Sequence, residues 1–225
     1  MILYKYCDEK GIDLLKNTRI KATNLADIND PFEFLPQMGD EVEEFNKALD
    51  NLYEYQKNNY RIVSLSKATC NIIMWGHYCN KHRGLLFKID TDKISKEIEG
   101  ENPFVEVTYS KERPKINLKG LAEGEDEQLM RSLRLLTYTK YEGWGYEEEV
   151  RAIIKYDHEK DYSYLDIPTD SILEVVLGKN VTWETVTLAK VILRQERFHH
   201  VKLKKAEIDR KRYFLNYKDI SVDIA

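Results

Sequence analysis

The segment Trp144-Gly-Tyr-Glu-Glu-Glu-Val-Arg151 (WGYEEEVR) joins an expected helix to the apolar run 152–155, and the expected fold is built around it. In an extended chain alternate side chains point to the same face, so Glu147, Glu149 and Arg151 would converge on one patch of a sheet. Three buried charges are costly unless they are paired. The segment is therefore either a salt-bridged sheet surface or a site whose chemistry needs carboxylates beside a guanidinium.

Outward from this segment, helices and strands follow one another without regular β-α-β alternation, which predicts an α+β fold. Strands are expected at 2–7, 19–23, 61–66, 84–90, 104–109, 171–177, 200–208 and 213–220, and another begins in the acidic stretch of 144–151 and continues over 152–155. Helices are expected at 11–16, 40–58, 71–79, from 126 toward 141, and at 182–195, where Thr182 is the expected N-cap.

The length of 225 residues suits a single domain, 1–225. A mobile loop is expected at about 110–125, which contains Pro114, Gly120 and Gly124 among many charges. The alternating segments near the C-terminus, joined by the turn-like DRKR, predict a hairpin at about 200–220.

The formal net charge of -4 gives no overall attraction to nucleic acid or to an anionic membrane. No stretch approaches the roughly 20 apolar residues of a membrane span, and the start of the chain turns charged before an apolar region develops. Its three cysteines are odd in number and widely spaced, which is typical of a reducing compartment. We therefore expect a cytoplasmic protein with no membrane segment.

The stretch Ile72 to Gly84 (IIMWGHYCNKHRG) gathers Trp75, His77, Tyr78 and His82 in a short space. A core helix does not require two histidines beside these aromatic residues. A helix that ends near the glycine would present several of them at its C-terminal rim. This pattern favours a ligand-facing surface.

Two other chemistries can be drawn from the same stretch. Cys70, His77, Cys79 and His82 offer zinc-type ligands, but their spacing does not match the paired knuckles of closed zinc sites, so no metal is expected. Cys79 with a neighbouring histidine could act as a nucleophile, although free cysteines are more often buried as small apolar residues.

Asn29-Asp30-Pro31 predicts a turn, because proline fixes its own φ and moves Asp30 out of the α region. Asn29 and Asp30 are either structural turn residues or ligand contacts. The basic tail is also open to two interpretations, a solvated edge strand or a phosphate-binding patch for nucleic acid. Its cations are Lys202, Lys204, Lys205, Arg210, Lys211 and Arg212.

Three boxes, INDPFE (28–33), MWGHYCNKHRG (74–84) and WGYEEEVR (144–151), resemble an uncharacterised family of bacterial and phage proteins. The LYKY-like (3–6) and EVVLG-like (174–178) segments resemble it too. The order of elements in that family is similar to the ADP-ribosyltransferase fold, a split α+β sheet, mixed or antiparallel with flanking helices, that holds NAD in a cleft. The resemblance implies a strand-borne glutamate that bonds the nicotinamide ribose while the glycosidic bond breaks.

Carried over by position, the catalytic glutamate would be Glu149, with Glu147 as the second choice, and Arg151 would orient the pair. The strand that holds Tyr4, Lys5 and Tyr6 would contact the adenosine side. By their clustering, His77, Tyr78 and His82 would line the nicotinamide or acceptor side, with Tyr78 or Trp75 stacked on a planar ring. NAD is then the expected small-molecule nucleotide, and Glu149 should face a pocket shared with His77 and Tyr78.

Two alternatives stay open. The same cleft could belong to a non-catalytic nucleotide-sensing or protein-interaction module, for instance in phage defence. A cleft closed by a Glu149–Arg151 salt bridge, with no cavity beside His77, would favour that module. The other alternative is nucleic-acid binding through the basic C-terminal hairpin. The acceptor of a transfer reaction, whether protein, nucleic acid or water, and the oligomeric state are not predicted.

Overall fold

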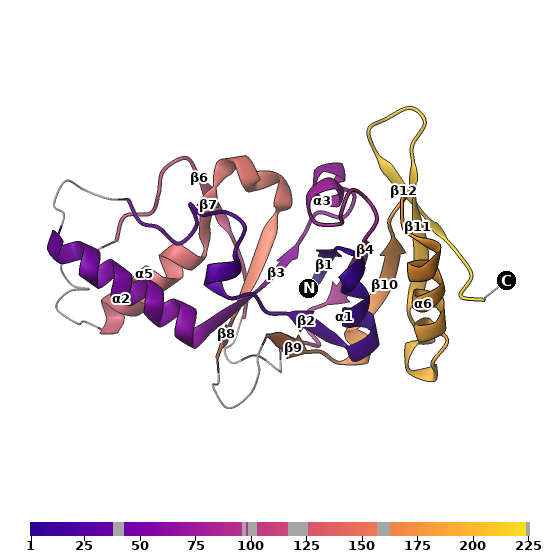
Figure 1. The fold of residues 1–225 in the computed structure, drawn as a ribbon, viewed down its shortest axis with the longest axis horizontal. Coiled ribbons are helices and arrows are strands. Elements are labelled where there is room, and N and C mark those ends of the chain that lie inside the picture. The colour runs from indigo at the N-terminus through magenta and orange to yellow at the C-terminus, as the bar shows by residue number, and fades with distance from the viewer. Residues whose placement is uncertain (38–42, 96–97, 99–102, 117–125, 157–162, 224–225) are drawn as a thin grey trace.

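An eight-stranded mixed sheet forms the centre of the computed structural model, which describes residues 1–37, 43–95, 98, 103–116, 126–156 and 163–223 (Figure 1). Each neighbouring pair is antiparallel except β10 and β11, which run parallel. Helices flank this sheet, so the predicted α+β class is confirmed. In spatial order the strands are β12 (Leu215–Asp219), β11 (Lys202–Ile208), β10 (Ile172–Leu177), β4 (Leu85–Asp90), β1 (Ile2–Cys7), β3 (Tyr60–Ser66), β8 (Glu149–Lys155) and β5 (Phe104–Glu106).

The sheet is nearly interrupted between β1 and β3. Strand β1 pairs with β4 along its whole length, and β3 pairs with β8 along its whole length. Across the junction only Tyr4 and Ser66 are in register. The unpaired length of this junction leaves room for side chains to line a cleft.

Two small sheets depart from the sequence-based expectation. β6 (Thr108–Ser110) pairs in parallel with β7 (Thr139–Tyr141), and β2 (Arg19–Lys21) pairs with β9 (Tyr164–Asp166), a strand that the sequence did not predict. The expected strand 104–109 was wrong as one unit, because β5 joins the main sheet whereas β6 leaves it for β7.

Helices cover both ends of the sheet (Figure 1). At one end α2 and α5 lie side by side, with Leu52 packed against Leu133 and Leu136. The predicted helix from residue 126 ends at Thr137, not near Tyr141, because the following residues pair as β7. The helices are α1 (Ile12–Asn17), α2 (Glu43–Asn59), α3 (Ile72–His77), α5 (Asp126–Thr137) and α6 (Trp183–Leu193).

Short 3₁₀ turns connect these elements, and two local features that the sequence predicts are present in the structure. Thr182 caps α6 by accepting from the Thr185 amide, as predicted. Strands β11 and β12 form an antiparallel hairpin. Residues 40–42 and 117–125, within the expected helix and the expected loop, lie outside the described ranges. The turns are η1 (Glu9–Gly11), η2 (Leu25–Asp27), η4 (Glu142–Glu147), η5 (Thr169–Ser171) and η6 (Glu196–Phe198).

The sheet has a core on each face. The larger one includes Leu3, Phe87 and Val175 and packs against α1 and α6. The smaller one, which includes Trp75 and Met74, places α3 over the other face. Asn71 caps α3 by accepting from the amides of residues 73 and 74, which fixes the start of α3 at Ile72. Within the described ranges, no helix has the length and apolar character needed to cross a membrane.

Candidate functional site

Five charged side chains meet in the interior beside the β1–β3 junction. Their exposed fractions are 7% for Glu33, 5% for Lys140, 3% for Glu147, 6% for Glu149 and 2% for Arg151. Because isolated charges at this depth would be strongly unfavourable, the network must compensate itself. We call these five residues the carboxylate cluster.

Lys140 is the cation that joins the three glutamates. Its Nζ lies 2.6 Å from Glu147 Oε2, 3.2 Å from Glu149 Oε2 and 3.2 Å from Glu33 Oε1. Although that last pair is close, Glu33 Oε1 is a buried side-chain atom that receives no hydrogen bond within the described part of the chain.

Arg151 binds the Glu149 carboxylate through two hydrogen bonds. Its Nε donates to Glu149 Oε1 at 2.8 Å and its Nη2 donates to Oε2 at 2.9 Å, the bidentate geometry that suits a guanidinium and a carboxylate. Nη2 also donates to Glu33, and Nη1 donates to the carbonyl of Thr137 at 2.7 Å. Arg151 therefore orients Glu149 but not the expected pair, because Glu147 is held by Lys140 and Tyr78 instead.

The backbone brings these groups together in a way that alternation did not predict. Glu149 and Arg151 share one face of β8, but Glu147 ends the 3₁₀ turn η4 and lies outside the strand. Glu148 adopts a left-handed conformation with φ 45°, which breaks the extended geometry. The expectation that all three charges lie on one strand face was wrong, although their side chains still converge through Lys140.

Charge pairing controls the ionisation of the cluster. Burial by itself would raise the pKa of Glu149, but Arg151 and Lys140 together lower this pKa to about 2. Burial and the hydrogen bond to the Glu147 carboxylate raise the pKa of Tyr78, so this phenol stays protonated and donates. Glu149 is consequently an ionised carboxylate across the physiological pH range.

A cleft of about 280 Å³ runs along the β1–β3 junction and reaches the cluster. The sequence-predicted residues Tyr4, Lys5, Tyr6, Asn29, Tyr78, Glu147, Glu149 and Arg151 all line it. Lys5 Nζ donates to the Ser64 carbonyl at 2.8 Å. Ser66 Oγ donates to the Glu147 carbonyl at 2.5 Å, which ties the end of β3 to η4.

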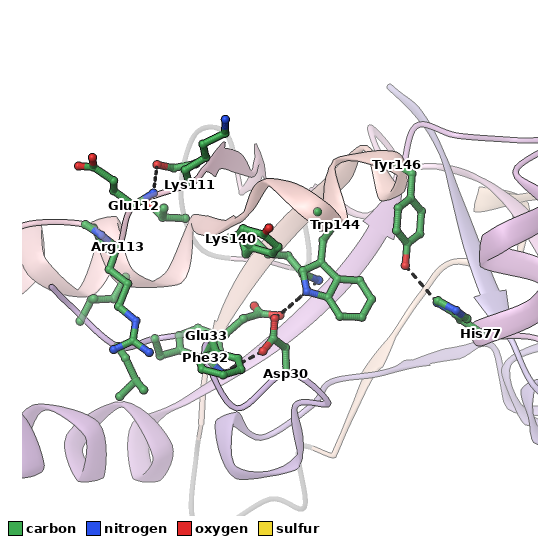
Figure 2. Close-up of a pocket in the computed structure, with 18 residues that line it drawn as sticks. Asp30, Phe32, Glu33, His77, Lys111, Glu112, Arg113, Lys140, Trp144 and Tyr146 are labelled. Atoms are coloured by element: carbon green, nitrogen blue, oxygen red, sulfur yellow. Dashed lines mark hydrogen bonds and ion pairs between the residues drawn. The ribbon is translucent and has the colours of Figure 1, made fainter.

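His77 and Asp30 lie elsewhere. Both line a second cavity of about 630 Å³ on the other side of Lys140 (Figure 2). His77 is exposed, and its Nδ1 is 3.0 Å from the hydroxyl of Tyr146. The expectation that Glu149 shares a pocket with Tyr78 and His77 is therefore met by Tyr78 only, since the α3 backbone turns His77 toward η4.

Trp75 and His82 do not reach either cavity. Trp75 is fully buried in the smaller core, and its Nε1 donates to the Tyr217 hydroxyl at 2.9 Å. His82 stacks on Trp75 with ring centroids 6.2 Å apart, in a turn where its φ is 64°. The structure gives both residues a packing role and does not place them with the nicotinamide or acceptor side.

The cysteine interpretations have no geometric support. Cys79 is fully buried, and burial raises the pKa of its thiol, which keeps it a poor nucleophile. Among the residues that the structure describes, no three His, Cys, Asp or Glu side chains are grouped as metal ligands.

Part of the basic tail is already paired. Lys204 Nζ lies 2.6 Å from Glu174, and Arg212 lies 3.2 Å from Asp209. Arg210 and Lys211 occupy the turn of the hairpin next to Tyr213, which is 96% exposed. Nucleic-acid binding here stays a prediction, which the salt dependence of the affinity would test.

Sequence reasoning missed Lys140 and gave no role to Glu33. Lys140 was assigned to the end of a helix, and the three residues of β7 are too few to show an alternation that separates them from it. Glu33 stands in the INDPFE box, directly after a turn fixed by Asp30, whose Oδ1 accepts from the Phe32 amide at 2.9 Å.

Comparison with known proteins gives one match. Residues 74–152 match the model of a family described as a protein of unknown function (DUF2971). No curated protein and no solved structure matches the chain. The matched range contains the last four residues of α3, the first four residues of β8, and all cluster residues except Glu33. This part of the chain is therefore similar to an uncharacterised domain family.

Proposed function

We propose that the chain binds NAD in the β1–β3 cleft and cleaves the nicotinamide–ribose bond, passing ADP-ribose to an acceptor or to water. The observation that carries the proposal is the buried, ionised carboxylate of Glu149 at the inner end of this cleft. It stands beside Glu147, whose side chain accepts from Tyr78. The sequence resemblance to the ADP-ribosyltransferase fold supports the same assignment.

The reaction requires negative charge rather than a proton donor. When the bond breaks, its electron pair moves to the positively charged nicotinamide ring nitrogen, so nicotinamide leaves as a neutral molecule. Positive charge then develops on the ribose as an oxocarbenium-like centre. A fixed carboxylate in a water-poor cleft stabilises that charge, and Glu149 fits this role because its pKa of about 2 keeps it ionised.

The cleft has a size and lining that match one half of the dinucleotide. Its volume of about 280 Å³ is just below the roughly 300–1,000 Å³ of ligand pockets for whole drug-sized molecules. The nicotinamide riboside half would occupy it, with the ribose hydroxyls at Glu149 and Glu147. Lys5 and Tyr4 line the opposite side on β1, where a cation and an aromatic ring can contact the rest of the molecule.

A non-catalytic nucleotide sensor is the second candidate. The bidentate pairing of Glu149 with Arg151 favours it, because an engaged carboxylate is less free to bind a ribose. A closed module would have no cavity beside His77, and the cavity of about 630 Å³ that His77 lines argues against it. Binding of NAD without turnover would distinguish the sensor from the enzyme.

The experiment combines NAD titration by calorimetry with a nicotinamide-release assay. Glu149→Gln keeps the shape of the side chain and removes its charge, and we expect at least a ~100-fold loss of turnover with the fold retained. Glu147→Gln is tested beside it. Glu106→Gln is the matched control, because Glu106, the last residue of β5, forms an exposed ion pair with Lys67. If the wild-type chain neither binds nor consumes millimolar NAD, the proposal fails.

A further inference from the structure

The cavity of about 630 Å³ is separated from the cleft by a shared wall. Of the described residues, only Glu33 and Lys140 line both spaces. The volume falls within the roughly 300–1,000 Å³ that small-molecule sites occupy. Its aromatic lining consists of Phe32, Phe34, His77, Tyr141, Trp144 and Tyr146.

One end of this cavity is a fixed aromatic platform (Figure 2). The ring centroids of Trp144 and Tyr146 are 6.0 Å apart, and that of His77 lies 6.3 Å from Trp144. The indole N–H of Trp144 donates to Asp30 Oδ2 at 2.6 Å, which holds the ring in place. Rigid aromatic faces of this kind favour a flat ring in the ligand.

Asp30 adds a requirement for a hydrogen-bond donor. Its side chain is buried at 8% exposure, and each carboxylate oxygen accepts one protein N–H. A carboxylate has about four lone-pair sites, so acceptor capacity remains. A ligand that carries an amino group beside its ring would use this capacity, whereas a plain aromatic acid would leave it without a donor.

The other end of the cavity offers one guanidinium. Figure 2 shows Arg113 at the end away from His77, with its guanidinium turned toward Phe32, whereas the side chains of Lys111 and Glu112 point away from it. The guanidinium carbon of Arg113 lies 5.7 Å from the Phe32 ring centroid. This contact with a ring face leaves the N–H donors of Arg113 available to an anionic group.

We propose that this cavity binds a mononucleotide with an amino-bearing base. The base stacks on Trp144 with its amino group at Asp30, and the phosphate lies at Arg113. The site goes beyond the NAD cleft and does not depend on it.

The test uses the fluorescence of 2-aminopurine riboside 5′-monophosphate, which stacking on an aromatic ring quenches. We expect saturable quenching of the nucleotide. The riboside, which has no phosphate, should bind roughly threefold to tenfold more weakly at low salt, and this difference in affinity should become smaller at high salt. Arg113→Gln should remove the difference in affinity between nucleotide and riboside without weakening the binding of the riboside. Arg194→Gln, at the exposed C-terminal end of α6, is the matched control and should change nothing.

Two results would overturn the inference. They are no saturable quenching at millimolar probe, and an Arg113→Gln variant that behaves like the control. Because the readout needs no turnover, failure of the NAD proposal leaves this test intact, and failure of this test leaves nicotinamide release unaffected.

Discussion

Replacing Lys140 with methionine isolates the contribution of the cation that joins the three glutamates. The substitution keeps most of the side-chain volume but removes the charge that lies 2.6 Å from Glu147, 3.2 Å from Glu149 and 3.2 Å from Glu33. Arg151 would remain as the only cluster cation against three carboxylates. The variant therefore leaves excess negative charge in a buried site.

The size of the effect follows from the burial of the group. Removing one partner of a buried ion pair typically costs about 3–5 kcal/mol, against a total stability of about 5–15 kcal/mol for a domain. For a chain of this length each kcal/mol lowers the melting temperature by roughly 2–4 °C. We expect Lys140→Met to lower it by about 6–20 °C.

The stability of the wild-type chain and that of the Lys140→Met variant should change with pH in opposite directions. In the wild-type chain the pKa of Glu149 is about 2, below its ordinary 4.5, so its stabilising effect is complete above pH 4.5 and is lost as the pH falls toward 2. In the variant the crowded carboxylates repel one another, so the pKa of at least one is raised above its unfolded value. Such a group destabilises the fold at high pH, and the variant should regain stability as the pH falls from 8 to 5.

Thermal unfolding followed by circular dichroism at pH 5, 6, 7 and 8 measures both effects. The matched control is Lys93→Met, which breaks an exposed pair with Asp170 at 2.9 Å and should cost at most about 1 kcal/mol. The reasoning would be refuted if Lys140→Met cost no more than this control. It would also be refuted if the variant and the wild-type chain showed the same pH profile between 5 and 8.

Four further substitutions test local contacts. Tyr78→Phe removes the phenol that donates to a cluster carboxylate and should cost about 1 kcal/mol in urea unfolding, with the fold unchanged. Gly84→Ala places a Cβ 1.9 Å from the Cys7 carbonyl and should cost about 3 kcal/mol or more, whereas Gly76→Ala meets nothing within 4 Å and should be neutral or stabilising by up to about 1 kcal/mol. Thr182→Ala removes the cap of α6 and should cost about 1 kcal/mol; an unchanged urea midpoint would contradict the assigned cap.

The elements that the sequence predicted well are those with local signals. The helix α6 begins after Thr182 because that side chain can satisfy a free amide of the first turn, whatever the rest of the fold does. Strands with clear boundaries, such as β3 after the long helix and β4 after Gly84, were also predicted within a residue or two. These signals lie within a few residues of the element that they specify.

The site was predictable only in part, because burial of a charge is a long-range property. Glu33 lies 118 residues before Arg151 in the sequence, and no local pattern says that these two residues and Lys140 meet. The strand at β7 exists because it pairs with β6, so Lys140 could not be separated from the preceding helix by periodicity alone. The position of Glu147 depends on the left-handed backbone at Glu148, which is uncommon for a residue with a side chain.

The internal pairing of the cluster also limits the chemistry that the cleft can perform. A group whose pKa is about 2 is a weak base and carries no proton near neutral pH, so Glu149 is unsuited to general acid–base catalysis. Its oxygens already accept from Arg151 and Lys140, which fixes the carboxylate in position before any ligand arrives. A charge that is fixed in advance needs no reorganisation during the reaction, and that is the property required for stabilising a developing cation. Any catalysis by this residue would therefore be electrostatic, which is why glycosidic cleavage of an already cationic leaving group suits the cleft better than reactions that need a proton transferred.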